Sequence, residues 1–292
     1  MRAIGSSCLA KIAGVHHIGG PYDVYNERVL GQGLADSPIL TIGKEIEPVI
    51  AKLGMMKMKE KGYHFHLRPG TEKGDGTTLT RFREFGGAPF RDTPDFTLSA
   101  SKRERKVLMV GEIKFVLYGD KDLYGPEWSQ ELPEGYLVQA QYHCFIYGVD
   151  VCVVFVSFGL YDYPRVYLVK ADDKKIGRMI KHAADWWRAH VVKRVPPPTD
   201  ATKACTDYLK FKAMQDESML DADLDDTQKA IELHAVKERM KAMKEEEKAL
   251  SNYFRERIAE KRGIDFGGGA SITCLPNSKG TRTLRTARLG DL

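Results

Sequence analysis

The chain has 292 residues and a formal net charge of +5, with 45 Lys and Arg against 40 Asp and Glu, so charge alone does not indicate a nucleic-acid partner. Its five cysteines form no Cys-x-x-Cys pair, which argues against a disulfide framework, a zinc knuckle and an iron–sulfur cluster. No apolar run approaches the roughly 20 residues that span a bilayer, so we expect a cytoplasmic protein without a membrane partner.

The residues before a run of three prolines are patterned as the helices and strands of one core. Helical periodicity predicts helices over 42–58, 136–147 and 172–192. Apolar and β-branched runs predict strands over 63–67, 77–85, 107–116, 151–158 and 165–169. A further strand, which carries Asp95, lies between the second and third of these, and the strands up to residue 116 form an antiparallel meander. The strand over 151–158 is apolar almost throughout, so we expect both of its faces to be buried.

Three consecutive prolines, Pro196 to Pro198, end the preceding helix and divide the chain. We therefore expect a core domain over 1–195 and an appendage over 196–292. Residues 226–262 are rich in Lys, Glu, Ala and Met, which predicts a long helix or a helical hairpin. The apolar residues there keep no strict heptad, so packing onto a neighbour is favoured over a coiled coil.

The last residues of the chain change in composition once more. A short strand is predicted over 272–275, and a basic segment without acidic residues follows it. We expect this segment to contact the DNA backbone through its basic side chains, which are Lys279, Arg282, Arg285 and Arg288. The alternative is a packed hairpin with buried apolar anchors, namely Ile272, Leu275, Leu284 and Leu289.

A carboxylate and a lysine interrupt the apolar strand over 107–116. Glu112 and Lys114 lie two positions apart, so their side chains project from the same face of the strand. Burying both charges is costly unless they pair with each other or bind a ligand. Asp95 lies on the preceding strand, and a metal ion would use both carboxylates.

These residues resemble the two half-motifs of the PD-(D/E)XK nuclease superfamily, with Pro94-Asp95 as the first and Glu112-Ile113-Lys114 as the second. Residues 43–48 look like the helix that supplies an upstream glutamate, and 136–142 look like the glutamine-bearing helix after the core. Together with 4–14, these segments are similar to the lambda exonuclease or YqaJ-type viral recombinase branch over roughly residues 1–195. The resemblance implies an α/β nuclease-like core with a central mixed sheet flanked by helices, followed here by a helical appendage.

The resemblance also implies a metal site. Asp95 and Glu112 would bind Mg²⁺, with Mn²⁺ as a substitute, because hard cations prefer carboxylate oxygens. The carbonyl of Ile113 would be a further ligand, and Glu47 would bind a second ion directly or through water.

Three further residues receive roles from the same resemblance. Lys114 would orient or deprotonate the attacking water, because a nearby cation lowers the pKa of an amine. Gln139 would hold that water or Lys114. Ser7 resembles a serine that contacts a terminal 5′ phosphate, and the equal alternative is an N-cap for the first helix.

Each of these assignments has a plain structural alternative. Glu112 and Lys114 would form only an ion pair with each other, and Asp95 would only begin a turn. Glu47 would be an exposed acid in the first turn of a helix, and Gln139 an ordinary polar helix position. Packing or surface positions are also favoured over zinc ligands or base stacking for three aromatic pairs, His16-His17, His64-x-His66 and Trp186-Trp187.

The function that the resemblance implies is a Mg²⁺-dependent 5′→3′ exonuclease. It would digest one strand at linear double-stranded DNA ends and leave a 3′ overhang for a phage-type single-strand annealing protein. Members of this branch commonly close into rings, which implies a homo-oligomer such as a ring trimer. One alternative is a PD-(D/E)XK endonuclease or single-strand nuclease, and another is a non-catalytic DNA-binding protein of the same fold.

Overall fold

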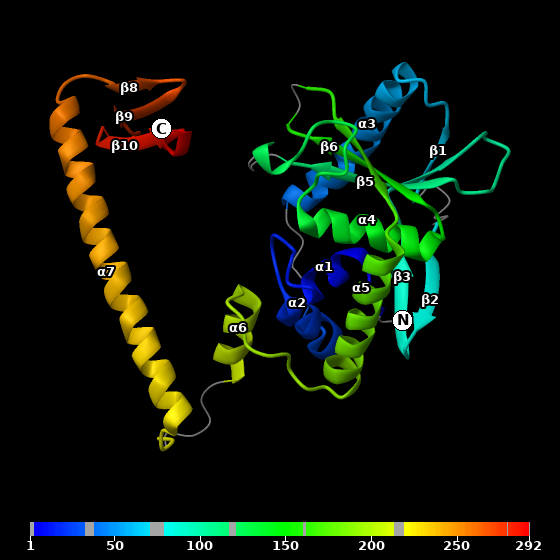
Figure 1. The fold of residues 1–292 in the computed structure, drawn as a ribbon, viewed down its shortest axis with the longest axis horizontal. Coiled ribbons are helices and arrows are strands. Elements are labelled where there is room, and N and C mark those ends of the chain that lie inside the picture. Colours follow the sequence, from blue (N-terminus) through cyan, green and yellow to red (C-terminus); the bar gives the residue numbers. More distant parts are fainter. Residues whose placement is uncertain are drawn as a thin grey trace. The chain divides into compact units, whose positions relative to one another are not determined.

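The computed structural model describes residues 3–32, 38–70, 79–116, 121–159, 162–212, 219–278 and 280–291. The chain forms two compact units, Met1–Ala213 and Met214–Leu292, each with its own sheet (Figure 1). Within the described ranges, no helix is long and apolar enough to cross a membrane.

A five-stranded sheet forms the centre of the first unit, in the order β1-β4-β5-β6-β7. Its strands are β1 (His66–Pro69), β4 (Phe96–Ser99), β5 (Met109–Phe115), β6 (Val151–Ser157) and β7 (Arg165–Lys170). β5 and β6 are parallel and the other neighbours are antiparallel, so the sheet is mixed, as predicted. A parallel pair requires a crossover connection, and helix α4 (Glu134–Tyr147) lies within that connection.

The predicted meander is wrong in one respect, because the strand expected over 77–85 does not join the central sheet. Instead β2 (Arg81–Phe85) pairs with β3 (Ala88–Asp92) as a separate two-stranded hairpin. Gly86 and Gly87 have φ angles of 57° and 75°, which a two-residue hairpin turn of this kind requires. The chain then returns to the central sheet, with Asp95 directly before β4.

Helices cover both faces of the central sheet (Figure 1). α3 (Pro38–Glu60) packs on one face, and α4 packs on the other together with α1 (Ser6–Ile12) and α5 (Asp173–Trp186). Alternate residues of β6 enter the two layers, since Val153 packs on the α3 side and Val154 on the α4 side. Both faces of β6 are therefore buried, as its continuous apolar run predicts.

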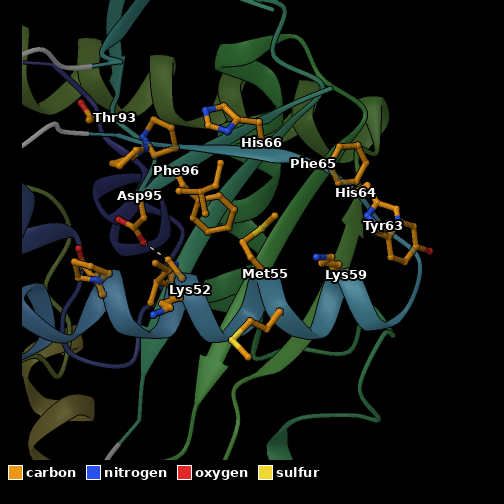
Figure 2. A pocket seen from close by; sticks show the side chains of 18 of the residues that line it. Lys52, Met55, Lys59, Tyr63, His64, Phe65, His66, Thr93, Asp95 and Phe96 are labelled. Carbon is orange, nitrogen blue, oxygen red and sulfur yellow. Dashed lines mark hydrogen bonds between the residues drawn. The ribbon is translucent and has the colours of Figure 1, made fainter. Parts of the chain in front are cut away.

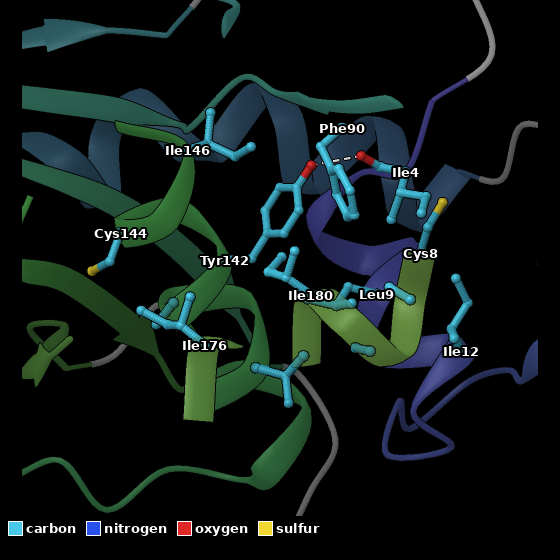
Figure 3. Close-up of a cluster of buried hydrophobic side chains, with 14 of the residues drawn as sticks. Ile4, Cys8, Leu9, Ile12, Phe90, Tyr142, Cys144, Ile146, Ile176 and Ile180 are labelled. Atoms are coloured by element: carbon cyan, nitrogen blue, oxygen red, sulfur yellow. Dashed lines mark hydrogen bonds between the residues drawn. The ribbon is translucent and has the colours of Figure 1, made fainter. Parts of the chain in front are cut away.

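The N-terminal segment is held in the α4 layer by the buried Tyr142. Its hydroxyl lies 2.5 Å from the carbonyl oxygen of Ile4 and 2.9 Å from that of Arg91. Figure 3 shows this ring among the apolar side chains of α1, α4 and α5. The segment that begins near Ile4 is thus attached both to β3 and to α4.

The first unit extends beyond the three prolines. Its smaller helices are α2 (Pro21–Tyr25), η1 (Asn26–Leu30), η2 (Lys121–Leu123), η3 (Trp187–Val192) and α6 (Lys203–Lys212), of which η1 and η3 are π-helices. Tyr208 on α6 packs its ring against those of Tyr22 and Tyr25, at centroid distances of 5.3 and 5.9 Å. The residues just after the prolines therefore pack on the first unit.

The second unit contains one long helix and a small sheet. α7 (Leu224–Ile258) is a single helix, which decides against the helical hairpin. Asp223 is its N-cap and accepts a hydrogen bond from the Asp226 N–H at 2.8 Å. The strands β8 (Gly263–Gly267), β9 (Ala270–Pro276) and β10 (Arg282–Ala287) form an antiparallel sheet, followed by η4 (Leu289–Asp291).

The basic tail is a packed strand. Three of its four expected anchors, Ile272, Leu284 and Leu289, join Ile258 of α7 in one small apolar cluster. The fourth, Leu275, is only half-buried. The packed hairpin expected as the alternative is therefore present.

Candidate active site

The structure brings Asp95 next to the strand that carries Glu112 and Lys114. The N–H of Asp95 donates to the carbonyl of Gly111 at 3.1 Å, and its carboxylate accepts from the N–H of Ile113 at 2.6 Å. These bonds follow from the antiparallel register of β4 and β5, in which Phe96 pairs with Gly111. The two half-motifs identified in the sequence thus meet at one point of the sheet.

Glu112 is held between two cationic groups. One carboxylate oxygen accepts from Nζ of Lys114 at 2.5 Å, so the predicted alternative of an ion pair between these residues is present. The other oxygen lies 2.9 Å from Nε2 of His143 on α4. Nδ1 of the same ring lies 2.6 Å from Asp92, at the end of β3. The result is a buried chain of alternating charge, Asp92–His143–Glu112–Lys114.

Burial is the largest single influence on the pKa values of Glu112, His143 and Lys114, but their charged partners together decide the direction of each shift. Burial raises the pKa of Glu112, but Lys114 and His143 outweigh it and lower that pKa to about 2. Burial lowers the pKa of His143, whereas Asp92 and Glu112 raise it well above its ordinary value, so the ring is an imidazolium. Burial also lowers the pKa of Lys114, but Glu112 raises it, and the side chain is an ammonium.

Two further carboxylates lie within electrostatic reach of Glu112. Burial raises the pKa of Asp95 well above its ordinary value, and the charges of Glu112 and Glu47 raise it further. The pKa of Glu47, on α3, is raised by burial and then by Glu112. Three acids from different elements therefore repel one another, and a bound cation would relieve that repulsion.

Among the residues that the structure describes, no group of three or more His, Cys, Asp or Glu side chains is already arranged around a metal position. Both oxygens of Glu112 and one oxygen of Asp95 already have hydrogen-bond donors. A cation would have to share these oxygens with the hydrogen-bond donors that already contact them. The donor set is nevertheless one of hard oxygens, which suits Mg²⁺ or Mn²⁺.

Gln139 lies one helical turn before His143, so both project from the same side of α4. Its amide oxygen is buried and has no hydrogen-bond partner among the described residues. Gln141, in contrast, bonds the backbone of Lys170 and of Asp172, at 2.7 and 2.8 Å. The two glutamines thus differ in their hydrogen bonding. Gln139, which the sequence analysis assigns to the site, has an unused buried acceptor, whereas Gln141 does not.

Asp92 and His143 are the site residues that the sequence analysis missed. His143 has a visible signal, since it follows Gln139 at the four-residue spacing that places two side chains on one helix face. Asp92 has no such signal, because it reaches the site only through the β2–β3 hairpin.

The pair His16-His17 lies at the edge of the same site. The rings stack at 4.7 Å, and that of His17 meets Tyr136 edge-on at 5.7 Å. Nζ of Lys114 lies 5.0 Å from the Tyr136 ring centre. Burial, then His17, Lys11 and Lys114, lower the pKa of His16 to about 4, so this ring is neutral.

The predicted phosphate-binding residues are divided between the two units of the chain. Ser7 is exposed on α1, and its alternative role as N-cap is wrong because Gly5 occupies that position. In the second unit, the guanidinium of Arg282 donates to the backbone carbonyls of Cys274, Ala259 and Lys261. Arg285 and Arg288 are exposed there, whereas Lys279 lies outside the described residues. Trp186 and Trp187 are buried, as packing predicts.

A cavity of about 1310 Å³ opens beside the site, between α3 and the strands β1 and β4. Asp95, Glu47 and Ile113 lie at its wall, together with lysines of α3 and aromatic residues near β1. Figure 2 shows Asp95 together with Lys52 and Lys59 of α3. His64 and His66 also line this cavity.

No protein-family model matches the chain. The chain is 21% identical over 267 residues to the uncharacterized protein YqaJ of Bacillus subtilis (strain 168), covering 89% of this chain and 76% of YqaJ. This similarity confirms the YqaJ-type resemblance. Among solved structures, an alkaline exonuclease from Laribacter hongkongensis is 16% identical with a TM-score of 0.44, and the match covers 72% of this chain and 92% of that one. A phage-related exonuclease from Haemophilus somnus 129PT is 15% identical with a TM-score of 0.44, and that match covers 66% and 97%.

Proposed function

We propose that this chain is a metal-dependent deoxyribonuclease that digests one strand of linear duplex DNA from the 5′ end and leaves a 3′ overhang. The observation that supports this activity is the proximity of Asp95, Glu112, Glu47 and Lys114, of which Asp95 and Glu47 also line an open cavity. Three mutually repelling acids beside an ammonium are suited to a cation and a phosphate. The YqaJ-type resemblance supports the choice of DNA ends as substrate.

Asp95, Glu112 and Glu47 are the residues that would hold Mg²⁺, with the Ile113 carbonyl as a further ligand. When bound, the ion would supply charge neutralisation at the scissile phosphate and a more acidic water. Glu47, which comes from α3 rather than from the central sheet, would be the additional ligand that a second ion needs.

The protein's own groups have separate tasks in this proposal. The ammonium of Lys114 donates hydrogen bonds and stabilises negative charge that develops on the phosphate oxygens. The free amide oxygen of Gln139 accepts from the attacking water and orients it. His143 fixes the carboxylate plane of Glu112 through Nε2, so it positions a ligand rather than reacting itself.

The test is digestion of linear duplex labelled at the 5′ or at the 3′ end, beside the same DNA as a closed circle. We expect Mg²⁺-dependent loss of the 5′ label first, a remaining 3′ overhang and an intact circle. Digestion of the circle would instead identify an endonuclease. Asp95→Asn and Glu112→Gln should each lower the rate on the order of 10²-fold or more.

A matched control for these variants is Glu60→Gln, which removes one exposed acid from the end of α3. It should digest DNA at the rate of the unmodified protein. If the two site variants also digest DNA at that rate while folded, cleavage does not depend on these carboxylates, and the proposal is wrong.

The partners are proposed on the YqaJ-type resemblance. A ring, for which a trimer is the expected state, would keep the enzyme on one strand between cleavage steps by enclosing it. A phage-type single-strand annealing protein would take up the 3′ overhang. Light scattering of the purified protein tests the trimer, and a mass equal to one chain at working concentrations would exclude it.

A further inference from the structure

We propose that the cavity between α3 and β1 is a track for a short segment of single-stranded nucleic acid that leads away from the candidate active site. The inference rests on the proposed nuclease function for its choice of ligand. The positions of the track residues rest on the structure alone.

The track is continuous with the candidate site. Asp95 and Glu47 line the same cavity as Lys59 and Tyr63. Glu47 and Lys59 are twelve residues apart on α3, which is about 18 Å of helix at about 1.5 Å per residue. At about 3.4 Å for each stacked nucleotide, that length holds about five nucleotides.

The part of the cavity away from the site is lined by positive charge. Lys52 and Lys59 are both exposed, and their seven-residue spacing places them on the same face of α3. Neither has a carboxylate within 4.0 Å among the residues that the structure describes. Lys57, which does not line the cavity, is instead paired with Glu127 at 2.5 Å. The two unpaired lysines are thus available for phosphates.

Aromatic rings stand at the far end of the track. Tyr63 is 38% exposed, and its ring is nearly parallel to those of Phe65 and Trp128, at angles of 15° and 21°. The centroid distances are 6.4 and 6.0 Å. Unpaired bases stack on such rings whatever their identity, since every base has a flat π-face.

A single strand fits these features better than a duplex. The base faces of a duplex are covered by their neighbours, so they cannot stack on Tyr63. The wall of the track also includes Met55 and Met56, whose flexible apolar side chains suit bases rather than a second phosphate backbone. Lysines together with aromatic and apolar groups in one cavity match the phosphates and the bases of a single nucleic-acid strand.

The experiment measures the binding of a fluorescently labelled 12-nucleotide oligo(dT) by anisotropy, with the full-length protein in EDTA so that no cleavage occurs. Tyr63→Ala should weaken binding about tenfold, and Tyr63→Phe should leave it within about twofold because the ring remains. Lys52→Ala with Lys59→Ala should reduce the slope of log K against log salt by about 1.4, at about 0.7 for each phosphate contact.

Matched controls remove the same residue types elsewhere on the first unit. Tyr163 is 59% exposed, and Lys174 is exposed on α5, so Tyr163→Ala and Lys174→Ala should change neither affinity nor salt slope. All variants replace exposed side chains, and their melting temperatures should match that of the unmodified protein. The lysine double variant tests the track independently should Tyr63→Ala melt early.

The proposal is overturned if the unmodified protein does not bind the oligonucleotide, or if the Tyr63 and lysine variants bind it with unchanged affinity and salt slope. These outcomes are distinct from failure of the nuclease proposal. Glu112-dependent digestion with normal binding by the track variants would reject the track alone. Weakened binding by the track variants, in a protein that cleaves no DNA, would reject the nuclease and keep the track.

Discussion

Replacing His143 by alanine should destabilise the first unit more than replacing any exposed histidine does. The ring is 1% exposed, and its two nitrogens lie 2.6 and 2.9 Å from the carboxylates of Asp92 and Glu112. Removing the shared cation leaves two buried carboxylates without their partner, and breaking a buried ion pair in this way costs about 3–5 kcal/mol. At roughly 2–4 °C for each kcal/mol in a unit of this size, the melting temperature should fall by about 10 °C.

The assay is urea unfolding followed by tryptophan fluorescence. Trp128, Trp186 and Trp187 are the three tryptophans of the chain, and all belong to the first unit, so the signal reports that unit alone. His182→Ala is the matched control, because this histidine is exposed on α5. If both variants lose less than about 1 kcal/mol, the buried charge chain does not stabilise the fold and the reasoning is refuted.

The same residue determines how stability changes with pH. The two carboxylates raise the pKa of His143 in the folded protein, above the ordinary value of about 6.5 in the unfolded chain. The contribution of His143 to the free energy of unfolding is therefore complete below about pH 6.5 and is lost as the pH rises through the higher pKa of the folded protein. The difference in unfolding free energy between the unmodified protein and His143→Ala should be largest below about pH 6.5 and should shrink steadily as the pH rises above that value.

Three other substitutions test separate parts of the structure. Lys114→Ala should lower the cleavage rate on the order of 10²-fold while calorimetry shows Mg²⁺ still binding, and collapse of Mg²⁺ affinity would make the residue structural. Gly111→Ala should yield little folded protein, because a Cβ at that position would overlap the ring of Phe96 in the core, and a normal melting curve would contradict this packing. Arg285→Ala with Arg288→Ala should reduce the salt slope of duplex binding by about 1.8, at about 0.9 for each phosphate contact, with no change in melting. An unchanged slope would assign these arginines no DNA contact.

The sequence predicts the parts of the site that depend on one strand and its immediate neighbour. Glu112 and Lys114 share a face because the side-chain period of a strand is two. Asp95 reaches them because β4 and β5 are adjacent both in sequence and in the sheet.

The rest of the site depends on contacts between distant residues, which periodicity does not encode. Glu112 and His143 are 31 residues apart, and Asp92 and His143 are 51 apart. These residues come together in space only because α4 lies over the sheet and because β2 and β3 leave the central meander as a hairpin. The two glycines of that hairpin turn are visible in the sequence, but the identity of the partner strand is not.

In the appendage, composition predicts either a long helix or a helical hairpin, because helix propensities add up over many residues, and the structure has the single helix. The sequence does not decide whether the tail contacts DNA or packs as a hairpin, since arginines and apolar residues are interspersed there. Packing of Ile272, Leu284 and Leu289 against the end of α7 decides it. Charge alone does not predict the contacts of Arg282, because its guanidinium donates to backbone carbonyls of its own chain.

The bond between Tyr142 and Ile4 sets an order of events during synthesis. The two residues are 138 positions apart, so the first helix leaves the ribosome long before its packing partner exists. At about 5–20 residues per second, the delay is roughly 10–30 s. Throughout that time the apolar side of α1 lacks the surface of α4 and α5 that helps to bury it in the finished fold. Nascent chains arrested before residue 142 should therefore depend on chaperones for solubility, and chains arrested after α5 should not.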